Sequence, residues 1–292
     1  MCGELPLIQG VPQPVRSAPL QATLERVVTR RVETNRPRLA PEQVRVAVID
    51  LADPQQPLLA EHRGTEPVYP ASVVKMFYMG CAYHLAREGK ISLTPRLRNR
   101  LYEMMHASSN LATAWVLDRL SGVEHDAAMQ PEEYAEFARK RNVCNRWLRS
   151  LGFTEVNANQ KTWVTPIPPG EQQFLRDGRL EGPYTNRNAM SALAAARYLQ
   201  LNAQDALVDA EACRDMRRLM LRDLGKQRYQ RRRIAGGAPK GAKVFAKSGT
   251  TTQTFHDAGI VTLADGRSYI LVVLVTGKGS KGAIICLLYT SD

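Results

Sequence analysis

Residues 70–87 read PASVVKMFYMGCAYHLAR, and this stretch decides the fold. From Ser72 to Glu88, apolar side chains fall on nearly every face of a helix, which is typical of a helix buried centrally in a protein. Ser72 would lie in the first turn, where the unpaired helix amides offer positive potential. Lys75 follows one turn later, so we expect the hydroxyl and the amine to be neighbours.

The surroundings of Lys75 suggest chemistry. Burial disfavours the charged ammonium, so the pKa of Lys75 should fall. A serine beside a lysine with a depressed pKa is a nucleophile with its base. Tetrapeptides of this kind are common by chance, and the alternative is a helix start whose lysine extends its ammonium to solvent.

Two further motifs support the catalytic interpretation. Ser108-Ser109-Asn110 opens the next strong helical pattern and offers a second hydroxyl and an amide. Lys247-Ser248-Gly249-Thr250 ends a strand pattern and offers a cation and a hydroxyl for a substrate carboxylate. Its glycine would let a ligand approach the backbone closely.

In chain order, S-x-x-K, S-x-N and K-[ST]-G resemble the motif set of class A-like serine β-lactamases and penicillin-binding proteins (DD-peptidases). The resemblance covers roughly residues 20 to 276. It implies a serine hydrolase that forms an acyl-enzyme.

The resemblance also implies a role for each motif residue. Ser72 looks like the acylated nucleophile, Lys75 like its base and Ser108 like a proton relay. Asn110 is similar to the residue that holds the substrate amide. The strand motif would bind the substrate through Lys247, Ser248, Gly249 and Thr250. The backbone N–H groups of Ser72 and Thr250 would form the oxyanion hole.

Two departures from the family pattern affect the expected activity. The E-x-x-L-N motif of class A deacylation is absent, and Glu171 in the long irregular segment 157–187 is the positional candidate for the water-activating base. The alternative interpretation is that Glu171 is a surface residue with no role in the reaction. Without a base, the acyl-enzyme would form and persist. His256-Asp257 stands where class A enzymes usually carry an Asn-Asp pair, and we interpret Asp257 as structural.

These residues leave three functions open. The first is β-lactam ring hydrolysis of the class A type. The second is D-alanyl-D-alanine carboxypeptidase, amidase or esterase activity. The third is non-catalytic binding of lactams or cell-wall peptides. Each takes a small-molecule β-lactam or a cell-wall peptide, and we expect a monomer.

The order of elements predicts an α+β, two-lobed β-lactamase-like domain. A helix over 20–33 precedes strands over 44–51 and 58–62, and three more strands follow over 242–247, 256–263 and 268–276. A five-stranded antiparallel sheet flanked by helices is therefore expected, with an all-helical lobe inserted into it. The sheet lobe would comprise 20–65 and 226–292, and the helical lobe 66–225. Residues 1–18 are expected to form an irregular extension.

Other kinds of site have little support. Five cysteines and five histidines lack metal-ligand spacing, so neither a metal nor a cofactor is expected. The net charge is +12, with much of it between Lys226 and Lys243. We interpret that segment as a solvated loop and expect no obligate nucleic-acid partner, because it has one aromatic residue. The glycine pattern from Gly277 to Gly282 lacks the second strand and acidic residue of a dinucleotide site.

The ends of the chain carry further expectations. No apolar stretch approaches the roughly 20 residues of a membrane span. Residues 1–16 lack the apolar region of a secretory signal, so the protein is either cytoplasmic or has lost its true N-terminus. Residues 283–289 are β-prone where the family has a helix. We therefore expect a truncated or non-native C-terminus.

Overall fold

The computed structural model of the 292-residue chain describes residue 8 and residues 10–34, 39–124, 126–162, 166–177, 186–225 and 228–277. Contacts divide the chain into two compact units. Met1–Val73 with Ser191–Asp292 forms what we call the sheet unit, and Val74–Met190 forms the helical unit. His125, Cys2, Cys286 and residues 278–292, with the predictions made on them, lie outside the described residues.

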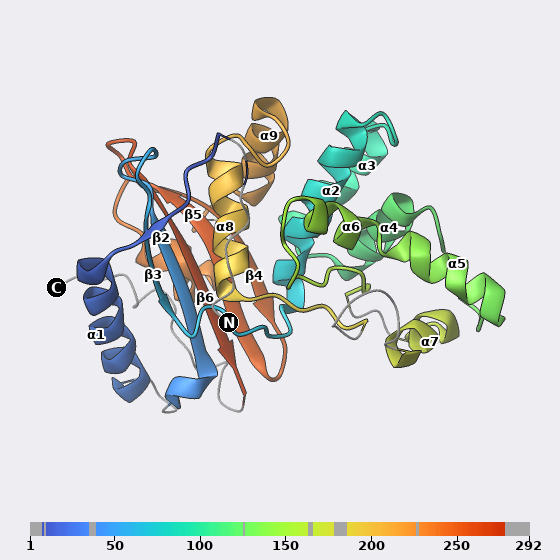
Figure 1. Cartoon of the computed structure of the whole chain (residues 1–292), viewed down its shortest axis with the longest axis horizontal. Coiled ribbons are helices and arrows are strands. Elements are labelled where there is room, and N and C mark those ends of the chain that lie inside the picture. Colours follow the sequence, from blue (N-terminus) through green and yellow to red (C-terminus); the bar gives the residue numbers. More distant parts are fainter. Residues whose placement is uncertain are drawn as a thin grey trace. The chain divides into compact units, whose positions relative to one another are not determined.

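The sheet unit contains a six-stranded sheet in the order β1-β3-β2-β6-β5-β4 (Figure 1). Its strands are β1 (Val15–Arg16), β2 (Val44–Asp50), β3 (Leu58–His62), β4 (Lys243–Thr250), β5 (Thr254–Thr262) and β6 (Ser268–Thr276). The predicted α+β fold is confirmed, but the sheet has six strands where five were predicted. Val15 and Arg16, which were assigned to an irregular extension, pair in parallel with Leu58 and Leu59. A two-residue strand is too short to show a period-2 pattern.

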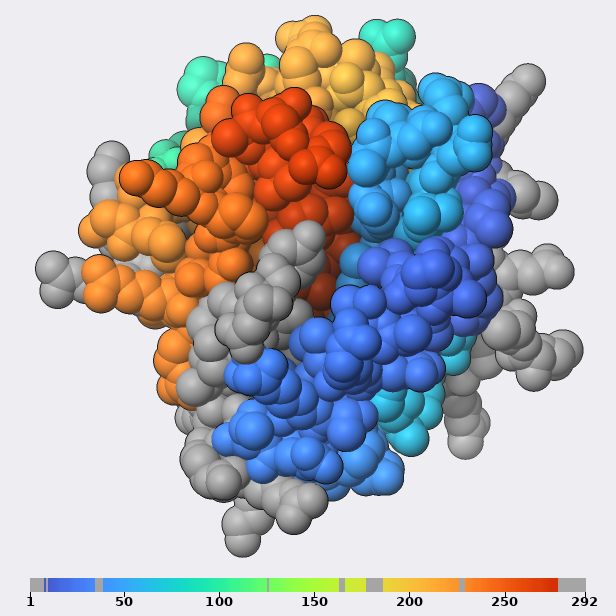
Figure 2. Space-filling model, turned by 90° about the vertical axis from the view of Figure 1, so that its left-hand side faces the viewer, coloured from blue at the N-terminus to red at the C-terminus, as the bar shows by residue number. Residues whose placement is uncertain are grey.

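Alternating apolar residues hold the rest of the sheet in register. In β2, Val44, Val46 and Val48 share one core cluster with Leu271 and Val273 of β6. The antiparallel pairing of β2 with β6 continues to their ends, where Leu51 N donates to Ser268 O at 2.9 Å. Figure 2 shows this contact region, with the β2–β3 turn in light blue beside the β5–β6 turn in red. β2, β5 and β6 are buried along almost their whole length, and their content of β-branched and other apolar residues explains why these strands were predictable.

Helices cover the sheet within its own unit. The α-helices are α1 (Ala18–Thr34), α8 (Ala192–Ala203), α9 (Ala210–Met220) and α10 (Ile234–Gly237), and the 3-10 helices are η1 (Pro41–Gln43), η2 (Ala71–Val74) and η3 (Arg228–Arg232). α1 packs on β3, α8 on β2, β5 and β6, and α9 on β4. The sequence places 191–225 in the helical lobe, whereas the contacts group these residues with the sheet. Because α8 is buried from Ala192 to Asn202, its pattern alone gives no direction of packing.

The helical unit consists of α2 (Lys75–Arg87), α3 (Pro95–Met105), α4 (Asn110–Ser121), α5 (Pro131–Arg141), α6 (Val143–Ser150) and α7 (Pro169–Asp177). The expected buried helix is confirmed in α2, where every residue from Lys75 to Tyr83 is buried. Ser72 was expected in the first turn of this helix, but it lies in the 3-10 helix η2, and the α-helix begins at Lys75. Within the segment expected to be irregular, α7 forms and packs the fully buried Phe174 against Phe137.

The basic segment differs from the solvated loop that was predicted. In its described part, η3 and α10 form, and Gln230, Arg233 and Ile234 are buried. A guanidinium can be buried where it finds acceptors, which charge counting does not show. Among the described residues, no helix is long and apolar enough to cross a membrane.

Candidate active site

Lys75 is the centre of the candidate site in the helical unit. Its side chain is fully buried at the start of α2. The Nζ atom donates to Ser108 O at 2.7 Å and to Asn110 Oδ1 at 2.8 Å, and lies 3.3 Å from Ser108 Oγ. The first two motifs of the sequence therefore meet at one ammonium group.

An unusual turn brings these acceptors together. Ser108 has a φ of 58°, which costs an L-residue on the order of 1–2 kcal/mol. Ser109 then caps α4, with its Oγ accepting from Ala112 N at 3.1 Å. Asn110 is the first residue of that helix. Strain of this kind persists where neighbouring contacts fix the backbone, as the Lys75 hydrogen bonds do here.

Burial changes the proton affinity of Lys75. It lowers the pKa from 10.5 to about 7, because the charged form loses hydration. At neutral pH, a substantial fraction of the amine is therefore unprotonated. An amine in that state can accept a proton from a nearby hydroxyl, as the sequence predicted for a base.

The sheet unit contains Ser72 and the strand motif. Ser72 is half-buried in η2, and Ala71 before it has a φ of 48°. A Cβ added at Gly249 would lie 2.7 Å from Pro70 O and 3.1 Å from Ser72 N. This glycine therefore permits β4 to pass directly beside the segment that carries Ser72, as expected of a close backbone approach.

The other residues of the strand motif lie along the edge strand β4. Lys247 is 1% exposed, and its Nζ donates to Ser248 O at 2.8 Å. Ser248 is partly accessible and Thr250 is exposed. β4 thus presents a buried cation and two hydroxyls within a few residues of Gly249.

Arg233 is a residue that the sequence interpretation missed. Its Nη2 donates to Thr250 Oγ1 at 2.6 Å, and it also donates to His256 O. The guanidinium carbon lies 3.5 Å from the centroid of the Phe255 ring. Burial lowers the pKa of Arg233 from its usual value, against the attraction of Asp257. Arg233 is the last of three consecutive arginines, and the sequence pattern predicts that all three belong to a solvated loop.

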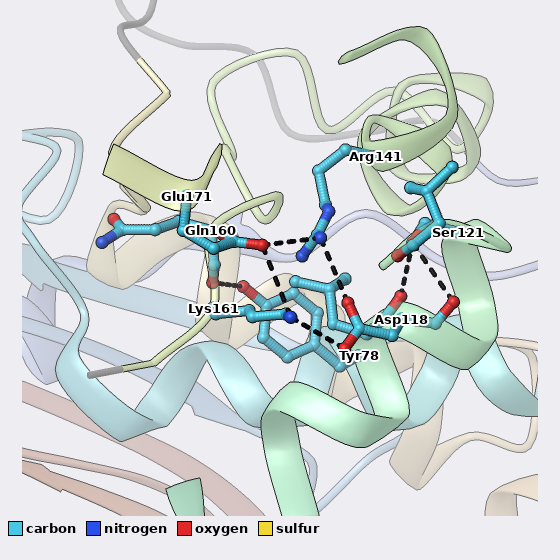
Figure 3. Close-up of polar contacts among 9 residues, drawn as sticks. Tyr78, Asp118, Ser121, Arg141, Gln160, Lys161 and Glu171 are labelled. Atoms are coloured by element: carbon cyan, nitrogen blue, oxygen red, sulfur yellow. Dashed lines mark hydrogen bonds and ion pairs between the residues drawn. The ribbon is translucent and has the colours of Figure 1, made fainter. Parts of the chain in front are cut away.

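Glu171 lies in a group of four charges in the helical unit, in which Glu171 and Arg141 are buried and Asp118 and Lys161 are partly buried (Figure 3). Glu171 Oε1 is 2.7 Å from Arg141 Nη2 and 3.5 Å from Lys161 Nζ. Asp118 contacts the same two cations, at 3.1 Å and 2.7 Å. Glu171 is 3% exposed, so the alternative of a surface glutamate is wrong.

Asp118, the second carboxylate of this group, has a different pKa from an exposed aspartate. Burial raises the pKa of Asp118 from 3.8 to about 6, although Arg141 and Lys161 favour its charged form. Among the described residues, Glu171 has Arg141 and Lys161 as its charged partners, while Lys75 has Ser108 and Asn110. The contacts of Glu171 therefore do not include the Lys75 group.

Asparagines organise the segment around Glu171, and their mutual contacts were not predicted from the sequence. Asn157 and Ala189 exchange backbone hydrogen bonds of 2.8 and 2.9 Å, which close the segment at its base. Side-chain hydrogen bonds at this base connect buried asparagines, which are Asn142, Asn145, Asn157, Asn159 and Asn186. Buried amides that satisfy one another give a polar segment a defined conformation.

Comparisons with known proteins match this architecture. The structure of PBP-A has a TM-score of 0.63 at 18% identity over 96% of both chains. A β-lactamase from Sphaerobacter thermophilus DSM 20745 gives 0.63 at 16%, covering 91% of this chain and 94% of that one. A class A β-lactamase representative from Bacteroides cellulosilyticus DSM 14838 gives 0.64 at 16%, covering 92% and 96%. These identities support the fold alone.

The sequence comparisons go further for the family. No curated protein is matched by the chain. The family model described as the β-lactamase enzyme family matches residues 94–285, which is more than half of the chain. With its fold, this match shows that the chain belongs to the β-lactamase enzyme family.

Proposed function

We propose that the protein is a serine hydrolase that acts through an acyl-enzyme on Ser72, with β-lactam ring hydrolysis as its first activity. The observation that carries the proposal is the buried Lys75 amine, which has a pKa of about 7 and contacts Ser108 and Asn110. Ser72 precedes it by one helical turn along the chain. A nucleophile needs such a base to react at neutral pH.

The proposed reaction balances with these groups alone. Neutral Lys75 accepts the proton of the Ser72 hydroxyl as Oγ bonds to the lactam carbonyl carbon. The C–N bond then breaks, Ser108 Oγ–H gives its proton to the departing nitrogen, and the Lys75 ammonium reprotonates Ser108 Oγ and becomes neutral again. Water hydrolyses the resulting ester and restores Ser72. The backbone N–H groups of Ser72 and Thr250, which both belong to the sheet unit, would stabilise the oxyanion.

The proposed substrates carry a carboxylate. Lys247 and Arg233 supply positive charge at β4, where Ser248 and Thr250 add hydroxyls. Charge-assisted hydrogen bonds of this kind favour anionic ligands. A PBP-A variant was solved as its acyl-enzyme complex with penicillin-G. Penicillin and peptides ending in D-alanyl-D-alanine both have the carboxylate that such a strand would bind.

A second candidate is penicillin binding with slow turnover, as in a D-alanyl-D-alanine carboxypeptidase, amidase or esterase. The observation that favours it is the pairing of Glu171 with Arg141 and Lys161. The two cations occupy Glu171 Oε1 and so compete with a water molecule for the same carboxylate oxygen. If Glu171 does not activate water, the acyl-enzyme persists.

One experiment separates these functions. Wild type and Ser72→Ala are mixed with a chromogenic cephalosporin and, separately, with a peptide ending in D-alanyl-D-alanine. Rapid cephalosporin turnover by wild type alone supports lactam hydrolysis. Release of D-alanine with slow cephalosporin turnover supports the second candidate. Equal signals from wild type and Ser72→Ala would refute a serine acyl-enzyme, and binding without reaction would leave a non-catalytic binder.

A further inference from the structure

The turn from Tyr69 to Ser72 has an unfavourable backbone conformation that neighbouring contacts must stabilise. Ala71 has a φ of 48°, and Val73 N donates to Pro70 O at 3.1 Å to close a tight turn. A left-handed alanine is unfavourable by about 1–2 kcal/mol, so its neighbours must fix the turn. The position of the Ser72 hydroxyl depends on this turn.

Two residues that face each other across β4 and β5 contact both ends of the turn. Gly249 and His256 are register partners, and opposite residues in an antiparallel pair share one face of the sheet. Gly249 leaves room for Pro70 O and Ser72 N. The His256 Nε2 atom lies 3.0 Å from Tyr69 O.

The tautomer of His256 is fixed by a second contact. Val275 N donates to His256 Nδ1 at 3.1 Å, so Nδ1 must be the acceptor and Nε2 carries the hydrogen. Nε2–H therefore donates to Tyr69 O. The ring is fully buried, with Arg233 and Arg45 nearby, and its pKa falls to about 4. The neutral donor form is thus the state present at neutral pH.

We infer that His256 is a positioning residue, which holds the Tyr69–Ser72 turn against the sheet and so aims the nucleophile. This inference rests on the proposed function of Ser72. His256 does not touch the substrate. It acts through the Tyr69 carbonyl, together with the open face that Gly249 provides.

The test compares three variants by their second-order rate of acylation with a fluorescent penicillin. His256→Ala removes the donor and should slow acylation by roughly 100-fold, as a misplacement of about 1 Å does. His256→Gln restores an amide donor and should recover part of the rate. Ile260→Ala is the matched control, because Ile260 is a buried residue on the same face of β5. It should acylate within about twofold of wild type despite its own cost in stability.

A second readout does not depend on activity. Hydrogen exchange of the Val73 amide should accelerate in His256→Ala and remain slow in Ile260→Ala. Wild-type acylation by His256→Ala, or an equal loss in Ile260→Ala, would overturn the inference. If wild type neither hydrolyses the penicillin nor forms an adduct, the proposed function fails. The positioning role is then decided by exchange, and equal Val73 protection in both variants would refute it.

Discussion

Arg141 Nη2 lies 2.7 Å from Glu171 Oε1, and both side chains are almost completely excluded from solvent. Lys161 contacts the same carboxylate oxygen, and Asp118 balances the charge. Breaking this buried pair removes one of the two carboxylates that balance Arg141. Glu171 thus has a structural role that is independent of any role in deacylation.

Glu171→Gln is expected to lower the free energy of unfolding by about 3 kcal/mol, because it removes one of the two carboxylates that balance buried Arg141 and partly buried Lys161. Urea unfolding measures this change. Glu136→Gln is the matched control, since Glu136 pairs with Arg139 and Lys140 on the exposed surface of α5. It should leave stability unchanged. If Glu171→Gln instead keeps full stability and converts rapid lactam turnover into a trapped adduct, Glu171 is the deacylation base.

Lys75→Arg is expected to slow acylation by about 10²- to 10⁴-fold, the usual contribution of a general base. The guanidinium stays protonated at all accessible pH values and cannot accept the Ser72 proton. Stopped-flow measurement with a fluorescent penicillin gives the rate. Lys90→Arg, at an exposed lysine beside Glu88, should acylate like wild type. An active Lys75→Arg protein would remove Lys75 as the base.

The acylation rate of wild type should depend on pH with a midpoint near 7. Below that pH Lys75 is protonated, and the rate should fall about tenfold for each pH unit. The lowered pKa of Lys75 also makes the stability of the folded protein depend on pH. Between about 7 and 10.5, the unfolded chain holds the Lys75 proton and the folded one does not, so this group makes stability rise with pH. A rate profile with its midpoint near 10.5 would contradict the buried environment of Lys75.

Gly249→Ala should reduce acylation by about 100-fold, because the added Cβ would meet Pro70 O at 2.7 Å and displace the Ser72 turn. Gly259→Ala provides the comparison. Its Cβ would meet Ala246 Cβ at 2.8 Å in the same sheet, at a position whose side chain points to the opposite face from Gly249. Both variants should lose stability in thermal unfolding, but Gly259→Ala should keep its acylation rate. Equal rates in the two variants would show that Gly249 does not serve the nucleophile.

Local patterns account for the parts of the structure that were predictable. The buried helix around Lys75 was predicted from apolar residues on nearly every face, and β2, β5 and β6 from runs rich in β-branched residues. The meeting of Lys75 with Ser108 and Asn110 was implied by the family resemblance of the motifs. These features depend on residues close in sequence or on a strong pattern.

The parts that were missed depend on long-range partners. Strand β1 is stabilised by pairing with β3, and α7 is stabilised by the packing of Phe174 against Phe137. Arg233 is buried because Thr250 and His256 accept its hydrogen bonds. The sequence identifies Arg141, Lys161 and Asp118 as charged residues, but residue identity alone does not predict that they cluster around Glu171.

The most direct test of the account is intact-protein mass spectrometry after incubation with penicillin-G, followed by peptide mapping. The account predicts that wild type either hydrolyses penicillin-G or gains the mass of one penicillin-G molecule, that any adduct maps to Ser72, and that Ser72→Ala does neither. An adduct on another residue, or an unmodified wild type that neither hydrolyses nor retains the drug, would contradict it.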